Sequence, residues 1–155
     1  MSVAERLRAA GITLPAPNPP GAVYVPTVQT GNLLFVSGHT AKRGGKPWVG
    51  QLGGAVTTAE GREAARAIAI DLMATLHAAL GDLERVQRIV KLLVLVSSAP
   101  TFTEHHLVAN GASELLVSIF GERGPHARSA FGVAQIPLGA CVEIEMVVEV
   151  DGAAV

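Results

Sequence analysis

The chain reads Gly124-Pro-His-Ala-Arg128-Ser-Ala-Phe-Gly-Val-Ala-Gln-Ile-Pro137-Leu-Gly-Ala-Cys-Val-Glu143-Ile-Glu145 near its C-terminal end. Alternating apolar residues on both sides of residues 137–140 predict two β-strands joined by a turn. An arginine stands at the entrance of the first strand, and glutamates lie inside the second. A guanidinium fixed on a sheet can bind a carboxylate at two points, and a half-buried glutamate can transfer protons. The stretch therefore predicts a small anionic substrate and acid–base chemistry.

The composition predicts one well-packed domain. The 155 residues are 49% hydrophobic and only 16% charged, which suits a single domain over residues 1–155. Within it we expect an N-terminal helix and proline-rich lead-in over residues 1–21 and a core over residues 22–150. A chain this apolar is expected to bury some of its surface against other subunits. The net charge of −1 lacks the basic excess of proteins that bind nucleic acid, so we expect no nucleic-acid partner.

The cysteine count and the apolar runs bear on where the protein works. Cys141 is the single cysteine, so an internal disulfide is excluded and a reducing compartment is favoured. No apolar run approaches the roughly 20 residues that cross a bilayer. The N-terminal residues lack the apolar segment of a secretion signal. The sequence therefore predicts a cytoplasmic protein without a membrane partner.

Three segments carry the pattern of a helix start and a helix end. In each, Ser or Thr is followed three residues later by Glu, which satisfies free amide donors, and a glycine ends the apolar pattern. These triplets are Ser2, Glu5 and Gly11; Thr57, Glu60 and Gly81; and Thr101, Glu104 and Gly121. We expect a short N-terminal helix and two long amphipathic ones.

The remaining segments predict strands and one long loop. Strands are expected over residues 24–30, 33–37, 88–97, 129–136 and 141–150, with a tight turn at Gly31-Asn32. The glycine-rich residues 41–54 are expected to form a mobile loop. The order ββαβαββ predicts an α+β fold, a mixed β-sheet with two long helices on one face. The second face of this sheet must also be covered. Self-association of several chains with closed symmetry would cover it.

The predicted register separates Arg128 from Glu143. If the strands flanking residues 137–140 form a hairpin, the two residues lie about six positions apart, or about 20 Å at ~3.3 Å per residue. That distance is too long for both to touch one small molecule within a chain. If they serve one site, they come from different subunits.

Plainer interpretations stand beside these. Arg128 can be an edge-strand arginine in a surface ion pair, although the small side chains around it leave room for a ligand. Glu143 can be an ordinary glutamate on a polar face. The five histidines show no metal-binding spacing, and Ser37 lacks the context of a serine nucleophile, so we expect no metal and no cofactor. His126 lies two residues before Arg128 and is expected in the same cleft.

Taken together, these segments resemble the YjgF/Rid family, the reactive-intermediate imine deaminases, which are also described as endoribonuclease L-PSP-like. The resemblance spans roughly residues 24–150 and is strongest in the final segment. Its pieces are Tyr24, Gly31-Asn32, Val36 to His39, Lys91, Asn110, Ala127 to Ser129, Ile136-Pro137 and Val142 to Glu145. The family commonly has glutamine where this chain has His39, and many members have cysteine where it has Ala130.

The resemblance implies a chorismate-mutase-like fold and a homotrimer with clefts between subunits. It implies that Arg128 clamps a substrate carboxylate and that Glu143 helps to activate water. We expect the pocket to be lined by Tyr24, Ser37, Gly38, His39, Asn110, His126 and Ser129. The predicted activity is hydrolysis of a 2-imino or enamino acid to a 2-keto acid and ammonia. Two alternatives stay open, a non-catalytic trimer that binds small carboxylates and a chaperone-like or structural assembly.

Overall fold

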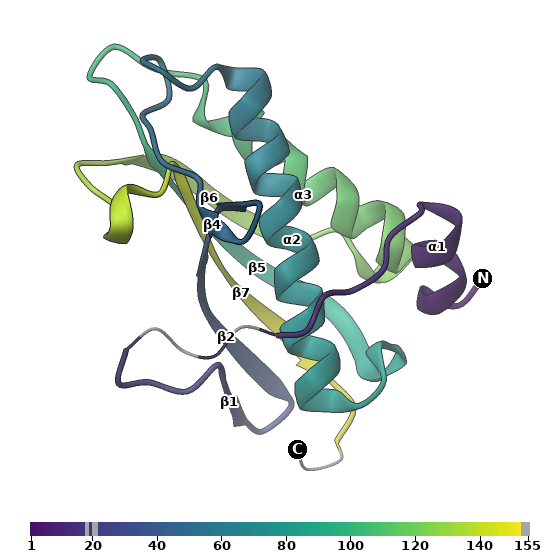
Figure 1. Ribbon diagram of the computed structural model, residues 1–155. Helices are drawn as coiled ribbons and strands as arrows, with labels where there is room; N and C mark the ends of the chain where they lie inside the picture. The colour runs from purple at the N-terminus through teal and green to yellow at the C-terminus, as the bar shows by residue number, and fades with distance from the viewer. Residues whose placement is uncertain (18, 20–21, 153–155) are drawn as a thin grey trace.

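The computed structural model of the chain describes residues 1–17, 19 and 22–152. A five-stranded sheet in the order β1-β2-β7-β5-β6 forms one layer (Figure 1). Only β5 and β6 are parallel, and the other neighbours are antiparallel. The strands are β1 (Thr27–Thr30), β2 (Leu33–Thr40), β5 (Val86–Ser97), β6 (Ala127–Val133) and β7 (Val142–Val150). Each of the five predicted strands is present, and no end differs from the prediction by more than three residues.

Two long helices, α2 (Thr58–Leu80) and α3 (His105–Phe120), cover one face of this sheet, and the short α1 (Val3–Ala9) lies beside α3 (Figure 1). The capping boxes predicted at Ser2 and Thr57 are both present. Gly81 and Gly121 end the long helices with positive φ values, as the sequence predicted. The α+β class with two helices on one face is confirmed.

The start of α3 differs from the prediction. The helix begins at His105, with Glu104 at the N-cap position and no side-chain cap, so the capping role predicted for Thr101 is wrong. The carboxylate of Glu104 instead accepts a hydrogen bond from the Thr58 hydroxyl, at 2.7 Å. This contact with the first turn of α2 uses the carboxylate that a local capping box would have needed.

The predicted pairing of the last two strands is also wrong. β6 and β7 do not form a hairpin, because β5 lies between them. Leu92 of β5 is the register partner of both Arg128 and Met146, and Leu95 is the partner of both Phe131 and Glu143. The connection between β6 and β7, which contains the 3-10 turn η3 (Pro137–Gly139), therefore crosses the end of β5. The predicted hairpin between β1 and β2 is confirmed.

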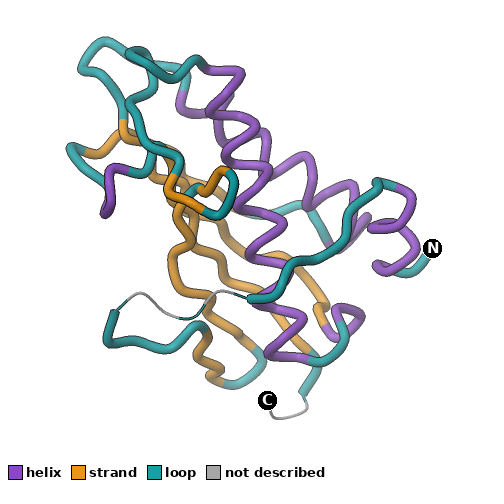
Figure 2. The backbone as a smooth tube through the Cα atoms, viewed as in Figure 1, coloured by secondary structure: helices purple, strands orange, loops and turns teal. Residues whose placement is uncertain are grey.

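The segment expected as a mobile loop contains regular structure. β3 (Lys42–Arg43) and β4 (Lys46–Pro47) form a small hairpin, in which the Arg43 guanidinium lies 4.7 Å from the centre of the Trp48 ring. Leu52 is fully buried and bridges to Ser98. Figure 2 shows the loop that leads into the first long helix and the loop that leads into the second running together at one end of the molecule, in agreement with this bridge.

The core fills the space between the helices and the covered face of the sheet. Leu72 and Leu76 of α2 and Leu116 of α3 are fully buried there, as are Ile144 and Val148 of β7. The other face of the sheet, which we call the open face, carries exposed apolar side chains. These are Val28, Leu33, Phe35 and Phe131, with exposed fractions of 55%, 37%, 45% and 47%.

The predicted proline-rich lead-in includes residues 18, 20 and 21, which lie outside the described residues, as do residues 153–155. None of the described helices is both long and apolar enough to cross a bilayer.

Candidate functional site

A cleft of about 630 Å³ lies along the part of β2 that β1 does not cover. The register between β2 and β7 shifts between Val36 and His39, so β2 has a bulge where its residues line the cleft. The cleft brings together five residues that the sequence singled out. They are Tyr24, Ser37, Gly38, His39 and Glu143.

Glu143 is the acid–base candidate of this cleft. Its side chain lies on the open face and packs against Gly38, in the space that a β-carbon at position 38 would fill. Burial raises the pKa of the Glu143 carboxyl above its ordinary value, and the nearby charge of Glu145 raises it further. Among the described residues, none donates a hydrogen bond to this carboxylate. It is therefore available to a ligand or a water molecule.

His39 lies on the covered face and links β2 to α2 through hydrogen bonds. Its Nδ1 lies 2.7 Å from the carbonyl oxygen of Ser37, so Nδ1 carries a proton, and its Nε2 lies 2.8 Å from the Thr75 hydroxyl. Burial lowers the pKa of His39, which favours the neutral ring with Nε2 as an acceptor. Both ring nitrogens are thus occupied within the protein.

Ser37 fixes the segment that leads into β1. Its hydroxyl donates to the carbonyl oxygen of Val25 at 2.7 Å, and its amide donates to that of Pro26 at 2.9 Å. These bonds hold Tyr24, which is 47% exposed, at the wall of the cleft. The role of Ser37 in this structure is to shape the pocket.

Arg128 lies outside this cleft, against α3. Its Nη1 donates to Asn110 Oδ1 at 2.9 Å and to Ser113 Oγ at 3.0 Å, and its Nη2 donates to the carbonyl oxygen of His106 at 3.4 Å. All three acceptors are neutral, and no carboxylate of the described residues pairs with this guanidinium. Three of the five N–H groups are used, which leaves Nε–H and one N–H of Nη2 for a ligand.

The ring of His126 supports this cluster from behind. Its Nε2 lies 2.9 Å from Ser113 Oγ, and its Nδ1 lies 2.7 Å from the carbonyl oxygen of Gly124. The structure therefore groups Asn110 and His126 with Arg128, and Ser113 joins them. Ser113 was missed by the sequence analysis, although its place three positions after Asn110 puts both on one helix face.

Within one chain, Arg128 and Glu143 point to opposite faces of the sheet. Arg128 shares the covered face with its partner Leu92, whereas Glu143 shares the open face with its partner Leu95. They are offset by three positions and separated by β5, so the offset of six positions expected from a hairpin is wrong. Their separation within a chain persists for a different reason, because the sheet itself lies between the two side chains.

Three further residues, Ser129, Asp71 and Cys141, have separate places in the structure. Ser129 lies on the open face, in register with Leu93 and Glu145, and not beside the Arg128 guanidinium. Asp71 of α2 lines the cleft, which the sequence did not suggest, and burial raises the pKa of its carboxyl. Cys141 is fully buried, and burial raises its pKa to about 11, so its thiol is not a nucleophile near neutral pH.

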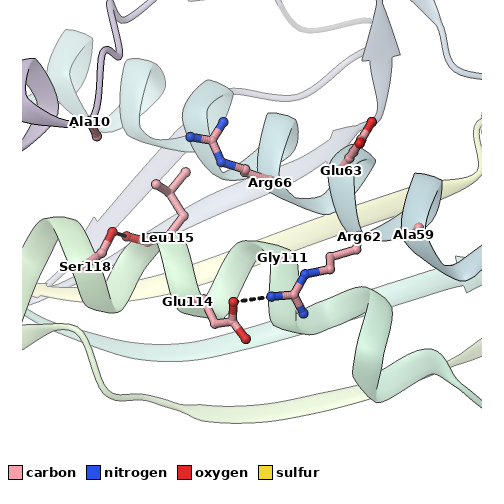
Figure 3. A pocket seen from close by; sticks show the side chains of 9 residues that line it. All are labelled: Ala10, Ala59, Arg62, Glu63, Arg66, Gly111, Glu114, Leu115 and Ser118. Carbon is pink, nitrogen blue, oxygen red and sulfur yellow. Dashed lines mark hydrogen bonds and ion pairs between the residues drawn. The ribbon is translucent and has the colours of Figure 1, made fainter.

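A second cavity, of about 540 Å³, lies between α2 and α3 on the outer helical surface (Figure 3). Arg62 and Glu114 form an ion pair across it, and Gly111 brings the two helices together beneath them. The charges of Arg62 and Glu114 neutralise each other. This second cavity therefore offers a ligand fewer unpaired charged groups than the Glu143 cleft does. Within the described parts of the chain, no three His, Cys, Asp or Glu side chains gather closely enough to hold a metal ion.

Comparison with known proteins agrees with this architecture. The model of a family described as "YjgF/chorismate-mutase-like, putative endoribonuclease" matches residues 4–150. The chain is 51% identical to Protein TCP17 of Trypanosoma cruzi over 151 residues, which cover 96% of this chain and 94% of that protein.

Two solved structures are similar over nearly their whole length. Atu1372 from Agrobacterium tumefaciens, a protein of unknown function, is 44% identical with a TM-score of 0.88, and the match covers 96% of this chain and 93% of that one. An endoribonuclease candidate from Shewanella oneidensis MR-1 is 32% identical with a TM-score of 0.93, covering 97% and 100%. In sequence and in fold, this chain belongs to the YjgF/chorismate-mutase-like family.

Proposed function

We propose that the protein hydrolyses reactive 2-imino and enamino acids to 2-keto acids and ammonia, at clefts between the subunits of a homotrimer. Arg128 of one subunit binds the substrate carboxylate, and Glu143 of a neighbouring subunit activates water. The observation that carries the proposal is the placement of the two residues. Each is available to a ligand, yet they face opposite sides of the sheet within one chain, so a shared site requires two chains.

The surroundings of Arg128 support a receptor for carboxylates. Its bonds to Asn110, Ser113 and the His106 carbonyl leave its positive charge unneutralised. The N–H groups that remain, on Nε and Nη2, suit the two oxygens of a carboxylate. Such a charge-assisted contact contributes about 1.5–3 kcal/mol.

The surroundings of Glu143 support proton transfer. A carboxylate with a raised pKa is a stronger base than an ordinary one, and it operates closer to neutral pH. In the proposed reaction, Glu143 takes a proton from water while the water oxygen bonds to the imine carbon, and the nitrogen receives that proton. The hydroxyl proton of the resulting amino alcohol then passes to the nitrogen, the C–N bond breaks, and 2-keto acid and ammonia leave. The balance is one imine and one water for one ketone and one ammonia.

The open face supports the homotrimer. Its exposed apolar residues Val28, Leu33, Phe35 and Phe131 would be covered if sheets from several protomers packed together, which would also bring neighbouring clefts to the interfaces.

The test is an assay in which an amino-acid oxidase generates the imine in place and the release of ammonia is followed. We expect Arg128→Ala to lower kcat/KM roughly 10- to 100-fold, and Glu143→Gln to lower kcat roughly 100-fold or more. Glu149→Gln is the matched control, because Glu149 lies on the same strand and face but outside the cleft. Undiminished turnover in Arg128→Ala would end the proposal.

The same variants separate the alternatives. A non-catalytic carboxylate-binding trimer would show no imine hydrolysis above background but would bind small carboxylates in an Arg128-dependent way. In that case Glu143→Gln would leave binding intact. A structural assembly would tolerate both substitutions. Cleavage of RNA by the wild type, lost in Glu143→Gln, would instead favour the nuclease activity named in the family description.

A further inference from the structure

We propose that Ser113 is a positioning residue for Arg128, supported from behind by His126. In this arrangement Ser113 holds the guanidinium in the orientation that leaves Nε–H open to a carboxylate. The identity of the ligand rests on the proposed function. The fixed orientation of the guanidinium does not, so the two can be tested apart.

The contacts of Ser113 define its role. Its Oγ lies 3.0 Å from Arg128 Nη1 and 2.9 Å from His126 Nε2. A guanidinium N–H can only donate, so the serine oxygen accepts from Arg128. The hydroxyl hydrogen of Ser113 is then free to point at the histidine.

The histidine can accept this hydrogen. His126 Nδ1 lies 2.7 Å from the carbonyl oxygen of Gly124, and a carbonyl only accepts, so Nδ1 carries a proton. In the neutral ring, Nε2 is consequently an acceptor for the Ser113 hydroxyl. The donors then run in one direction, from Arg128 to Ser113, from Ser113 to His126, and from His126 to Gly124. Each bond in such a chain strengthens the next.

The Gly124 end of this series of hydrogen bonds is held in place. A β-carbon at Gly124 would lie 2.6 Å from the α-carbon of Val117 and 2.9 Å from the carbonyl oxygen of Leu116, so the backbone there packs tightly against α3. The carbonyl that receives the His126 proton therefore has a fixed place. The hydrogen-bond chain transfers this fixed place to the guanidinium.

These contacts fix the plane of the Arg128 guanidinium. Asn110 and Ser113 both accept from Nη1, so rotation about the bond between Nε and Cζ has to break both contacts. Without Ser113, the contacts to Asn110 and, at 3.4 Å, to the His106 carbonyl hold the plane less firmly, and the edge with Nε is no longer presented in one direction.

The first experiment needs no ligand. The Nη signals of Arg128 are observed by ¹⁵N NMR and assigned from the spectrum of Arg128→Lys. In the wild type we expect separate Nη1 and Nη2 signals because rotation is hindered. In Ser113→Ala we expect rotation about tenfold faster, and Ser113→Thr, which keeps the hydroxyl, should restore slow rotation. Ser118→Ala is the matched control, since Ser118 lies on the same helix and its hydroxyl donates to the Leu115 carbonyl.

The second experiment measures binding of pyruvate, the simplest 2-keto acid, through the shift of the Arg128 Nε signal. We expect Ser113→Ala to raise Kd about tenfold and Ser118→Ala to leave it unchanged. In the imine assay, Ser113→Ala should raise KM and leave kcat within about threefold. His126→Phe should weaken binding less than Ser113→Ala, and the double variant should bind like Ser113→Ala alone, because His126 acts through Ser113.

The outcomes separate the two proposals. Unchanged rotation and an unchanged Kd in Ser113→Ala would overturn the positioning role and leave the proposed function standing. Hindered rotation that Ser113→Ala releases, with no Nε shift on addition of pyruvate to the wild type, would support the positioning role and count against the proposed function. Because alanine favours helix more than serine does, Ser113→Ala is expected to fold.

Discussion

The Glu143 carboxylate rests against the α-carbon of Gly38, where any larger residue at position 38 would place its side chain. Gly38 does not have a left-handed φ, so the glycine is needed for space and not for backbone conformation. The bulge in β2 and the missing β-carbon together make room for a half-buried carboxylate at the wall of the cleft.

Gly38→Ala is expected to displace the Glu143 side chain from this position. Ammonia release should fall at least about tenfold, because misplacing a catalytic group by about 1 Å can cost 100-fold. The melting temperature, measured by calorimetry, should change far less than the activity. Gly152→Ala is the control, since its β-carbon would lie 3.9 Å from the nearest atom. Full activity in Gly38→Ala would contradict this role of the glycine.

The raised pKa of Glu143 predicts a pH-dependent stability change. The folded protein holds this proton more tightly than the unfolded chain, whose carboxyl titrates near the ordinary value of 4.5. Ionised Glu143 therefore destabilises the fold, fully above its raised pKa and not at all below the ordinary one. Glu143→Gln should raise the free energy of unfolding at about pH 8 and leave it unchanged near about pH 3.5. Urea titrations at both pH values measure this, with Glu149→Gln as the control. A loss of stability at the higher pH would refute the assignment.

The open face predicts that assembly depends on Phe35. This side chain is 45% exposed and lies beside Val28 on the adjacent strand. Phe35→Glu would place a charge in the proposed interface, so light scattering should show a fall from three times the 16.0 kDa chain mass to a single chain. Val117→Glu, on the outer side of α3 and 40% exposed, should leave the mass unchanged. A wild type that is already a single chain would rule out the shared cleft.

The crossing of α2 and α3 predicts a cost for filling Gly111. A β-carbon there would overlap the carbonyl oxygen of Arg62. Alanine favours helix over glycine by about 0.5–1 kcal/mol, whereas overpacking costs about 1–3 kcal/mol. Gly111→Ala should therefore lower the free energy of unfolding by about 1–2 kcal/mol, measured in urea. Ser118→Ala, at an exposed position of the same helix, should not. A stabilised Gly111→Ala would show that the helices can move apart at little cost.

The elements that local patterns define could be predicted from the sequence. The capping boxes at Ser2 and Thr57, the turn between β1 and β2, and the apolar stripes of both long helices depend on residues close together in the chain. The errors arise where distant contacts decide. The helix start at Thr101 was wrong because Glu104 bonds to Thr58, and the hairpin was wrong because β5 pairs with both β6 and β7.

In the candidate site, too, local sequence motifs predicted some features, and contacts between distant residues decided the others. Sequence motifs found Glu143 and its cleft neighbours, and they found Arg128. They could not show that His39 faces the helices, because the bulge in β2 shifts the alternation of side chains between Val36 and His39. They also missed Ser113, whose importance comes from its position between Arg128 and His126.

The opposite orientations of Arg128 and Glu143 make each catalytic unit a joint product of two polypeptides in the proposed trimer. A chain with Arg128→Ala still supplies its glutamate, and one with Glu143→Gln still supplies its arginine. Two inactive populations, unfolded together and refolded as mixtures, would regain activity through complementation, with one intact centre in every mixed trimer.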